Sequence, residues 1–295
     1  MLRFALVLVT AGCGFQVSGG TDLDAAGPDG DRDPAGGDGS IDGASVGVWS
    51  TPTPVAVTAG ADDPTLTADL LELYFNLNGD IYLATRATVS DPWSTPTLVT
   101  QLSGGNDTTP EVSADGLTLM LASDRPGTLG STDLWISTRG SRAAAWGIPV
   151  VEVELGSVTS EAGPVMTPDR TTIVFTSFRK ANVSPDIYLS TRTDVSGPWG
   201  VPVEVPELNT DGHDGSAVIS ADKRMICFDS TRSGNSDLYC STRSTPSSTF
   251  PAPQTIPGIT TTEVEEDPWL SPDGRHLVFY SNRNGVAGLW ESTLQ

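Results

Sequence analysis

The stretch PWLSPDG at residues 268–274, followed by LVFYSNR at residues 277–283, decides the fold, because variants of both segments recur through the chain. Earlier copies of the first segment lie at 64–69, 110–116, 164–169 and 218–222. Each is followed by an apolar copy of the second, at 73–75, 119–125, 173–179 and 226–232. Self-similarity at a period of about 50 residues indicates a repeat architecture.

A third and a fourth segment keep the same register. The third starts at Asp80, Asp133, Asp186, Asp237 and Gly288, at spacings of 53, 53, 51 and 51 residues. The fourth starts at an aromatic residue that a proline follows three positions later: Trp93 and Pro96, Trp146 and Pro149, Trp199 and Pro202, Phe250 and Pro253. Each repeat therefore contains four short segments.

The composition of these segments indicates β-strands. The apolar runs are short, rich in Val, Ile, Phe and Tyr, and bounded by Asp-Gly, Ser-Asp-Arg or Gly-Asn turns, which is typical of strands. Four short antiparallel strands form one blade of a propeller. The sequence therefore predicts an all-β fold, a five-bladed β-propeller with four antiparallel strands per blade.

The two ends of the repeat region complement each other. The fifth repeat reaches Gln295 after its third segment, and an aromatic-plus-proline segment of the missing kind stands before the first repeat, at Trp49 and Pro52. We expect the N-terminal strand near Trp49 to complete the last blade and to cover an edge that would otherwise be exposed.

The first 13 residues have the pattern of an export signal. Arg3 precedes a short apolar run at 4–9, and small residues then lead to Cys13. A bilayer span needs about 20 apolar residues, so this run is too short for one. The residues before Cys13 resemble the lipobox of bacterial lipoproteins, which implies lipidation of Cys13. The alternative is an ordinary secretory signal with a chance cysteine.

The segment that follows is predicted to be a tether. Residues 14–45 are rich in Asp, Gly and Ala and show no apolar periodicity, so they cannot offset their chain entropy by burial. The predicted organisation is a signal peptide at 1–13, a tether at 14–45 and a propeller at 46–295.

The net charge of the chain excludes some classes of binding partner. The formal net charge is −21, whereas nucleic-acid binding needs clustered Lys and Arg, as does docking on an anionic membrane surface. We therefore expect no nucleic-acid partner and membrane contact through the lipid anchor only. The same acidity favours cations or basic partners.

The repeats resemble the PD40, or TolB-like, WD40-type propeller repeats of bacterial envelope proteins, over about residues 46–295. Residues 271–274 followed by 280–283 are close to the family pattern, and 221–223 is a looser copy. The resemblance implies a non-catalytic binding or scaffolding module whose partner is an envelope protein, peptide or glycan. We expect a monomer, and Gly14 after the cysteine favours the outer membrane, on its periplasmic or outer side.

Acidic residues recur three positions before the proline position of each repeat. The five residues are Ala61, Asp107, Glu161, Asp214 and Glu265, and Asp62 stands beside the exception. We expect them to converge at one mouth of the central channel, where repulsion would favour a cation or a basic ligand. Calcium is the candidate cofactor at Asp107, Glu161, Asp214 and Glu265. The alternative is that each carboxylate caps a local turn.

Two further residues are predicted at this mouth. His213 precedes one of the acids, and Trp269 lies in the corresponding segment of the fifth repeat. Trp269 could stack on a ligand or serve packing alone.

Two cysteines occupy strand positions that are aliphatic in other repeats. Cys227 and Cys240 flank the turn near Ser233, so they can face each other across two strands. An oxidising compartment would permit a disulfide, and the alternative is a pair of buried thiols.

Two arginine series also recur once per repeat: Arg125, Arg179, Arg232 and Arg283, and Arg86, Arg139, Arg192 and Arg243. We interpret them as structural links to carboxylates. The alternative function is a glycan-acting or glycan-binding propeller that uses the channel-mouth carboxylates, because paired carboxylates hydrolyse glycosides. Against catalysis, the acids follow the repeat symmetry, and we expect no catalytic residues.

Overall fold

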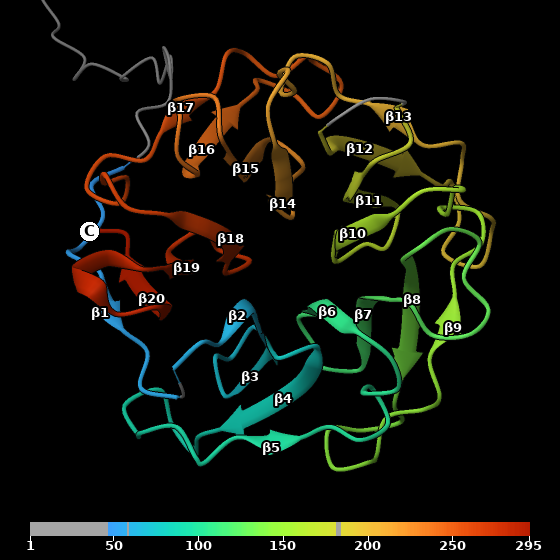
Figure 1. The fold of residues 1–295 in the computed structure, drawn as a ribbon, viewed down its shortest axis with the longest axis horizontal. Coiled ribbons are helices and arrows are strands. Elements are labelled where there is room, and N and C mark those ends of the chain that lie inside the picture. Colours follow the sequence, from blue (N-terminus) through green and yellow to red (C-terminus); the bar gives the residue numbers. More distant parts are fainter. Residues whose placement is uncertain (1–46, 58, 181–183) are drawn as a thin grey trace, which may run out of the picture. The chain divides into compact units, whose positions relative to one another are not determined.

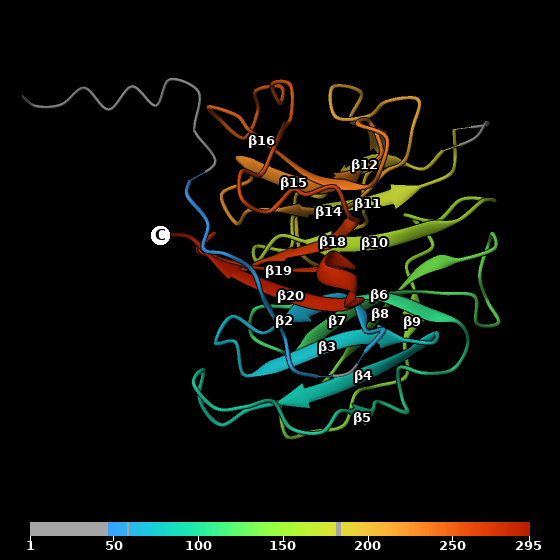
Figure 2. The ribbon, with the colours of Figure 1, turned by 60° about the vertical axis from the view of Figure 1, so that its left-hand side comes forward.

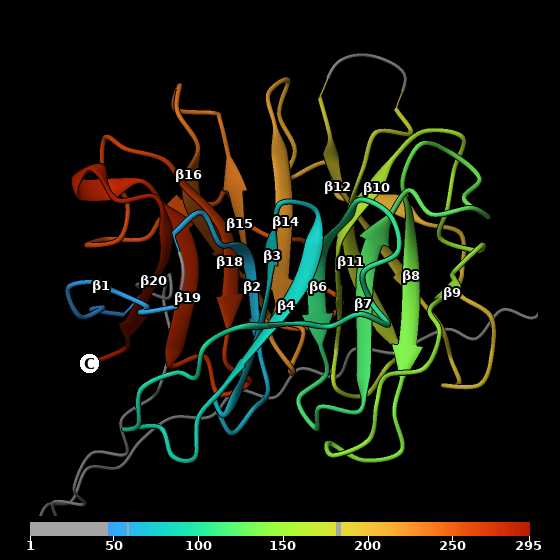
Figure 3. The same ribbon diagram turned by 60° about the horizontal axis from the view of Figure 1, so that its bottom comes forward.

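The computed structural model describes residues 47–57, 59–180 and 184–295. Its strands form five four-stranded antiparallel sheets arranged around a common axis (Figure 1). The sheets are the blades of a five-bladed β-propeller, as the repeats predict, and a single 3₁₀ turn lies at Arg283–Gly285 in the described part. Side views show the sheets standing around the axis (Figures 2 and 3).

Each blade runs from an innermost strand at the axis to a two-residue strand at the outer rim. Blade 1 comprises β2 (Asp62–Leu66), β3 (Glu72–Leu77), β4 (Asp80–Thr85) and β5 (Thr97–Leu98). Blade 2 comprises β6 (Asp107–Val112), β7 (Thr118–Ser123), β8 (Asp133–Thr138) and β9 (Val150–Val151). Blade 3 comprises β10 (Glu161–Met166), β11 (Thr172–Ser177), β12 (Asp186–Thr191) and β13 (Val203–Glu204). Blade 4 comprises β14 (Asp214–Ile219), β15 (Met225–Ser230), β16 (Asp237–Thr242) and β17 (Gln254–Thr255).

Blade 5 combines the two ends of the described chain. Its first three strands are β18 (Glu265–Leu270), β19 (His276–Ser281) and β20 (Gly288–Thr293), and its outer strand is β1 (Thr53–Pro54). Strand β1 pairs antiparallel with β20, with Pro54 opposite Trp290. The amide of Ser50 donates to the carbonyl of Thr293 at 2.9 Å. The prediction that a strand near Trp49 closes the ring is confirmed.

The hydrophobic core lies between neighbouring blades. Five clusters of buried side chains each combine residues of two adjacent blades. Between blades 1 and 2, for example, Tyr74 and Ile81 pack against Leu119 and Leu121. The second strand of each blade is therefore covered on both faces, which explains why these strands are continuously apolar instead of alternating.

All five innermost strands contain a β-bulge at the same place. In blade 3, Ala162 pairs with Thr176 and Val165 pairs with Val174, so the inner strand has one residue more than its partner. The register shifts in the same way in the other four blades. A bulge locally reorients side chains, and these five bulges decide which residues line the axis.

Candidate functional site

The bulges place one residue with a left-handed backbone from each blade around the axis. These residues are Asp63 (φ 49°), Thr109 (φ 46°), Gly163 (φ 56°), Ser216 (φ 45°) and Asp267 (φ 52°). Left-handed conformations are costly for residues other than glycine and persist where the surroundings enforce them. The five residues line a constriction with a cavity of about 30 Å³, which we call the throat.

Hydrogen bonds between neighbouring blades hold the throat. The amide of Thr109 donates to Oδ2 of Asp63 at 3.0 Å, and the amide of Gly163 donates to Oγ1 of Thr109 at 3.0 Å. Gly163 has no side chain to continue the series, and Oγ1 of Thr176 in the same blade accepts from the amide of Ser216 instead, at 3.0 Å. The hydroxyl of Ser216 then donates to Oδ1 of Asp267 at 2.8 Å.

The throat closes with a pair of carboxyl groups. Asp267 and Asp63 line the same small cavity, and burial raises the pKa of Asp63 to about 7, with the neighbouring charge of Asp62 adding to the rise. Burial, together with the charges of Asp63 and Asp229, raises the pKa of Asp267 well above its usual range. Two adjacent carboxylates that burial disfavours tend to hold a proton between them.

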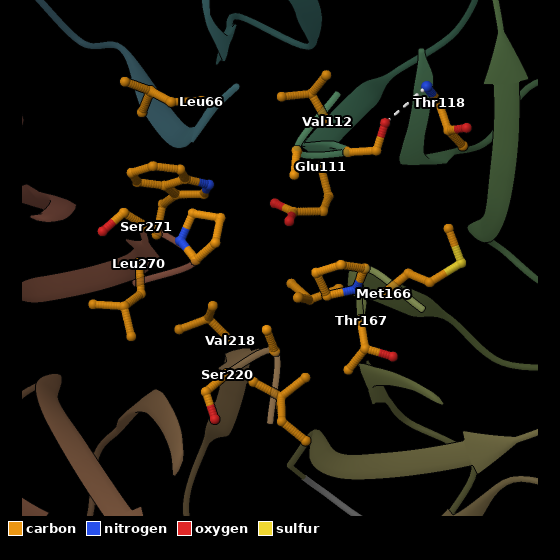
Figure 4. A pocket seen from close by; sticks show the side chains of 18 of the residues that line it. Leu66, Glu111, Val112, Thr118, Met166, Thr167, Val218, Ser220, Leu270 and Ser271 are labelled. Carbon is orange, nitrogen blue, oxygen red and sulfur yellow. Dashed lines mark hydrogen bonds between the residues drawn. The ribbon is translucent and has the colours of Figure 1, made fainter. Parts of the chain in front are cut away.

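A larger cavity continues from the throat along the axis. This cavity, which we call the chamber, has a volume of about 250 Å³ and takes side chains from all five innermost strands (Figure 4). Its walls are mainly apolar and include Leu66, Val112, Met166, Ile219 and Leu270.

One layer of the chamber shows where the blades differ most. The residue after the proline position is Thr65 in blade 1 and then Glu111, Val165, Val218 and Trp269. Glu111 borders both the chamber and the throat. It accepts a hydrogen bond from Oγ1 of Thr65 at 2.8 Å, and burial raises the pKa of its carboxyl group to about 8.

The acids that the sequence assigns to the channel mouth are not part of this lining. Asp107, Glu161, Asp214 and Glu265 are each fully buried, two positions before the throat residues. Each forms an ion pair with an arginine 18 residues later in its own blade: Arg125, Arg179, Arg232 and Arg283. Each pairing arginine also donates to a main-chain carbonyl, as Arg232 does to Leu208 at 2.6 Å.

The predicted convergence of these acids is therefore wrong. Asp107, for example, accepts hydrogen bonds from the amides of Gly104 and Gly105, at 2.6 and 2.8 Å. The carboxylates cap local turns, which was the alternative interpretation, and the predicted calcium site at these four residues is misplaced. Within the described ranges, no three His, Cys, Asp or Glu side chains form a group that could hold a metal ion.

Of three other predicted residues, Trp269 lies apart from His213 and Asp62, whose charges both act on Glu266. His213 directly precedes β14, and its Nε2 lies 2.6 Å from Oδ2 of Asp229. Trp269 is the fifth residue of β18 and lines the chamber, so the expectation that it neighbours His213 is wrong. Asp62 stands beside the throat and accepts a hydrogen bond from Asn76 at 2.6 Å, while burial raises its pKa.

The second arginine series links strands to the outer aromatic residues. Arg86, Arg139, Arg192 and Arg243 stack on Trp93, Trp146, Trp199 and Phe250, at 4.1 to 4.4 Å from the ring centroids. Arg139 also forms an ion pair with Glu72 of blade 1, at 2.5 Å. Cation–π contacts of this kind stabilise by about 0.5–2 kcal/mol each, which supports a structural role.

The two cysteines of blade 4 form a disulfide. Cys227 of β15 stands opposite Cys240 of β16, and both are buried between blades 4 and 5. Cys13 and the predicted signal and tether lie outside the described residues. Among the residues that the structure does describe, none belongs to a helix long and apolar enough to cross a bilayer.

Comparison with known proteins identifies the fold and nothing finer. No family model and no curated protein sequence matches the chain. A thermostable family-43 glycoside hydrolase shares 13% identity with a TM-score of 0.61, over 83% of this chain and 91% of that one. An endo-arabinase from Bacteroides thetaiotaomicron shares 13% identity with a TM-score of 0.56, over 83% and 98%. A putative TolB from Agrobacterium tumefaciens shares 20% identity with a TM-score of 0.49, over 76% and 70%.

Proposed function

We propose that this chain is a non-catalytic binding module of the bacterial envelope, attached through a lipid on Cys13, whose ligand enters the chamber. The observation that carries the proposal is the chamber itself. It is preformed, has a volume of about 250 Å³ and is lined mainly by apolar side chains with few polar groups. Small-molecule and cofactor sites have this character. The chamber is small, so we propose that it takes one group of a ligand whose remainder lies outside.

The attachment and the setting come from the sequence. The lipobox-like residues before Cys13 and the tether composition of residues 14–45 support a module held near a membrane surface. An envelope protein, a peptide or a glycan would supply the ligand.

A filled-chamber variant tests the proposal. Met166 lines the chamber and is partly exposed to it, so Met166→Trp should fill the space with little disturbance of the core. Val158→Trp is the matched control, because Val158 is 89% exposed and does not line the chamber. Residues 46–295 would be screened by thermal unfolding against envelope peptides, glycans and cell-wall fragments.

A ligand at 100 times its dissociation constant stabilises a protein by about 2.7 kcal/mol, which is a shift of several degrees for a domain of this size. We expect that shift in the wild type and in Val158→Trp, and its loss in Met166→Trp. A shift that survives in Met166→Trp would place the ligand elsewhere and contradict the proposal.

A glycan-acting enzyme is the second candidate. The observation in its favour is the carboxyl pair of Asp63 and Asp267 in a fold that glycoside hydrolases share. Two observations oppose it. The two carboxyl groups lie close enough for the charge of Asp63 to raise the pKa of Asp267, whereas glycosidases keep theirs about 5 to 9.5 Å apart, with room for substrate or water between them. The throat, at about 30 Å³, has room for roughly two water molecules and not for a sugar ring.

Chromogenic glycosides decide between the two. We expect no hydrolysis above background for arabinofuranosides, xylosides or glucosides. Turnover by the wild type that Asp63→Asn abolishes would favour the enzyme.

A further inference from the structure

We propose that the chamber selects an ammonium group carried on an apolar body, and that Glu111 is the carboxylate with which this cation pairs. The inference rests on the proposed binding function and names the chemical class of its ligand. It follows from the residues that surround Glu111.

Glu111 is the residue at which the chamber departs from the repeat. The other blades place Thr65, Val165, Val218 or Trp269 at this position. A repeat protein can fill this layer with uncharged residues, as four of its five blades do. The carboxyl group of Glu111 projects from β6 among the apolar walls of the chamber (Figure 4).

The protein leaves this carboxyl group short of partners. Thr65 donates one hydrogen bond, to Oε2, whereas a carboxylate can accept about four. Within the described part of the chain, Oε1 accepts none. The contrast with Asp107 on the same strand is direct, because Asp107 has an arginine and two amides as partners. At pH 7 the free protein holds this group mainly protonated, because burial raises its pKa to about 8, and a cationic ligand would supply the counter-charge that lets it ionise.

Among the described residues, no basic side chain forms an ion pair with Glu111. Arg170 is the one basic residue among the lining residues, and its guanidinium donates to Oγ1 of Thr118 at 2.9 Å. The next ionisable groups along the axis are the throat acids Asp63 and Asp267, which carry no positive charge in either protonation state. The net charge of −21 acts in the same direction by attracting cations to the molecule.

The remaining walls suit the apolar part of such a ligand. Trp269 stands in the same layer as Glu111, and an indole face attracts ammonium groups through its π electrons. Leu66, Val112 and Leu270 offer aliphatic surface. Together these walls fit a short alkyl or aryl chain that ends in a charged amine.

Three probes with the same alkyl chain separate charge from apolar contact. Hexylamine is cationic at pH 7, 1-hexanol is neutral and hexanoate is anionic. Their binding to residues 46–295 would be measured by isothermal titration in 0.15 M salt. We expect hexylamine to bind at least tenfold more tightly than 1-hexanol, and hexanoate more weakly than either.

Variants test the role of Glu111 itself. Glu111→Gln should lower the affinity for hexylamine to that for 1-hexanol and leave the affinity for 1-hexanol unchanged. Glu111→Val should act likewise, and it carries the residue that blades 3 and 4 already have at this position. Glu263→Gln, on an exposed residue outside the chamber, should behave as the wild type.

The outcomes for the inference and for the proposed function are distinct. Equal affinity for hexylamine and 1-hexanol, or a preference that survives in Glu111→Gln, overturns the inference. The proposed function would still hold if Met166→Trp abolished the binding of both. No binding of hexylamine at millimolar concentration also overturns the inference, and the ligand screen described above then decides the function separately.

Discussion

Asp63 and Asp267, on the first strands of the first and last blades, both line the throat, where burial and the charge of Asp63 together raise the pKa of Asp267. The two residues belong to neighbouring blades, Asp63 to β2 of blade 1 and Asp267 to β18 of blade 5. The pKa of Asp63 is raised to about 7 and that of Asp267 well above its usual range, in both cases mainly by burial. The unfolded chain would release these protons near its ordinary carboxyl pKa of 3.8. Between about pH 4 and pH 7 the native protein therefore binds more protons than the unfolded chain, and its stability falls as the pH rises.

Asp267→Asn should reduce this loss of stability. The amide keeps an oxygen that can accept from Ser216, and it removes the carboxyl group whose pKa is raised well above its usual range on folding. Each unit of pKa shift corresponds to about 1.4 kcal/mol, so we expect the variant to gain about 2 kcal/mol over the wild type between pH 4.5 and pH 8. Urea unfolding at the two pH values measures the difference. Asp211→Asn, on an exposed residue, is the control. If the free energy of unfolding of Asp267→Asn changes between the two pH values as much as that of the wild type, the prediction is wrong.

Asp107→Asn should destabilise the fold strongly. The substitution leaves the guanidinium of Arg125, whose side chain is 10% exposed, without its carboxylate. Breaking a buried ion pair from one side costs about 3–5 kcal/mol, and we expect about 3. Denaturant unfolding measures the loss.

Adding calcium tests the predicted calcium site that includes Asp107. Because Asp107, Glu161, Asp214 and Glu265 are held by arginines, we expect the unfolding temperature to differ by less than about 1 °C between EDTA and millimolar calcium. A larger shift that Asp107→Asn removes would restore the calcium site.

Reduction of the disulfide should lower the stability. The cysteines are 13 residues apart, and closing a loop of about 15 residues stabilises by about 3 kcal/mol in the loop-entropy model. Guanidinium unfolding with and without a reductant measures this difference. The matched control is Cys227→Val with Cys240→Leu, because Val174 and Leu189 face each other at the same place in blade 3. That double variant should be insensitive to the reductant; a reductant effect in it would assign the loss to something other than the disulfide.

Trp49→Ala should loosen the closure of the ring. Trp49 is 9% exposed and packs between blades 4 and 5, and Trp199, at the corresponding place in blade 3, is 7% exposed. Both alanine variants should lose about 3 kcal/mol. Only Trp49→Ala should also speed hydrogen exchange at the amides of Ser50 and Val55, which bond to β20. Equal exchange in the two variants would show that closure does not depend on Trp49.

The sequence predicts the blades well because each blade repeats local information. Strand lengths, turns and the order of segments recur in each of the five repeats. The closing segment at Trp49 is recognisable by its aromatic-plus-proline pattern alone. The facing of Cys227 and Cys240 also follows from the register of two consecutive strands joined by a short turn.

The lining of the channel could not be predicted in the same way. A regular strand would alternate its faces, so that Glu161, Gly163 and Val165 would point to one side. The bulge between Ala162 and Val165 adds a residue and breaks that alternation. Glu161 consequently turns into the blade, where Arg179 meets it. Bulges of this kind have no strong sequence signature when the left-handed residue is Thr109 and not a glycine.

Glu111 could have been found from the sequence by a different comparison. The acids that recur once per repeat follow the symmetry and lie inside the blades, whereas the side chains that give the chamber its character break that symmetry. A charged residue aligned with Thr65, Val165, Val218 and Trp269 is such a break.

The residues that hold the throat differ from the residues that line the chamber at the position after each proline. Hydrogen bonds from main-chain amides of one blade to side-chain oxygens of the preceding blade hold the throat, and they do not use the side chain at the position after each proline. The side chains at this position then set the ligand preference of the cavity: Thr65, Glu111, Val165, Val218 and Trp269. Single substitutions at this position, one blade at a time, could therefore change the ligand specificity during evolution while the propeller fold stays the same.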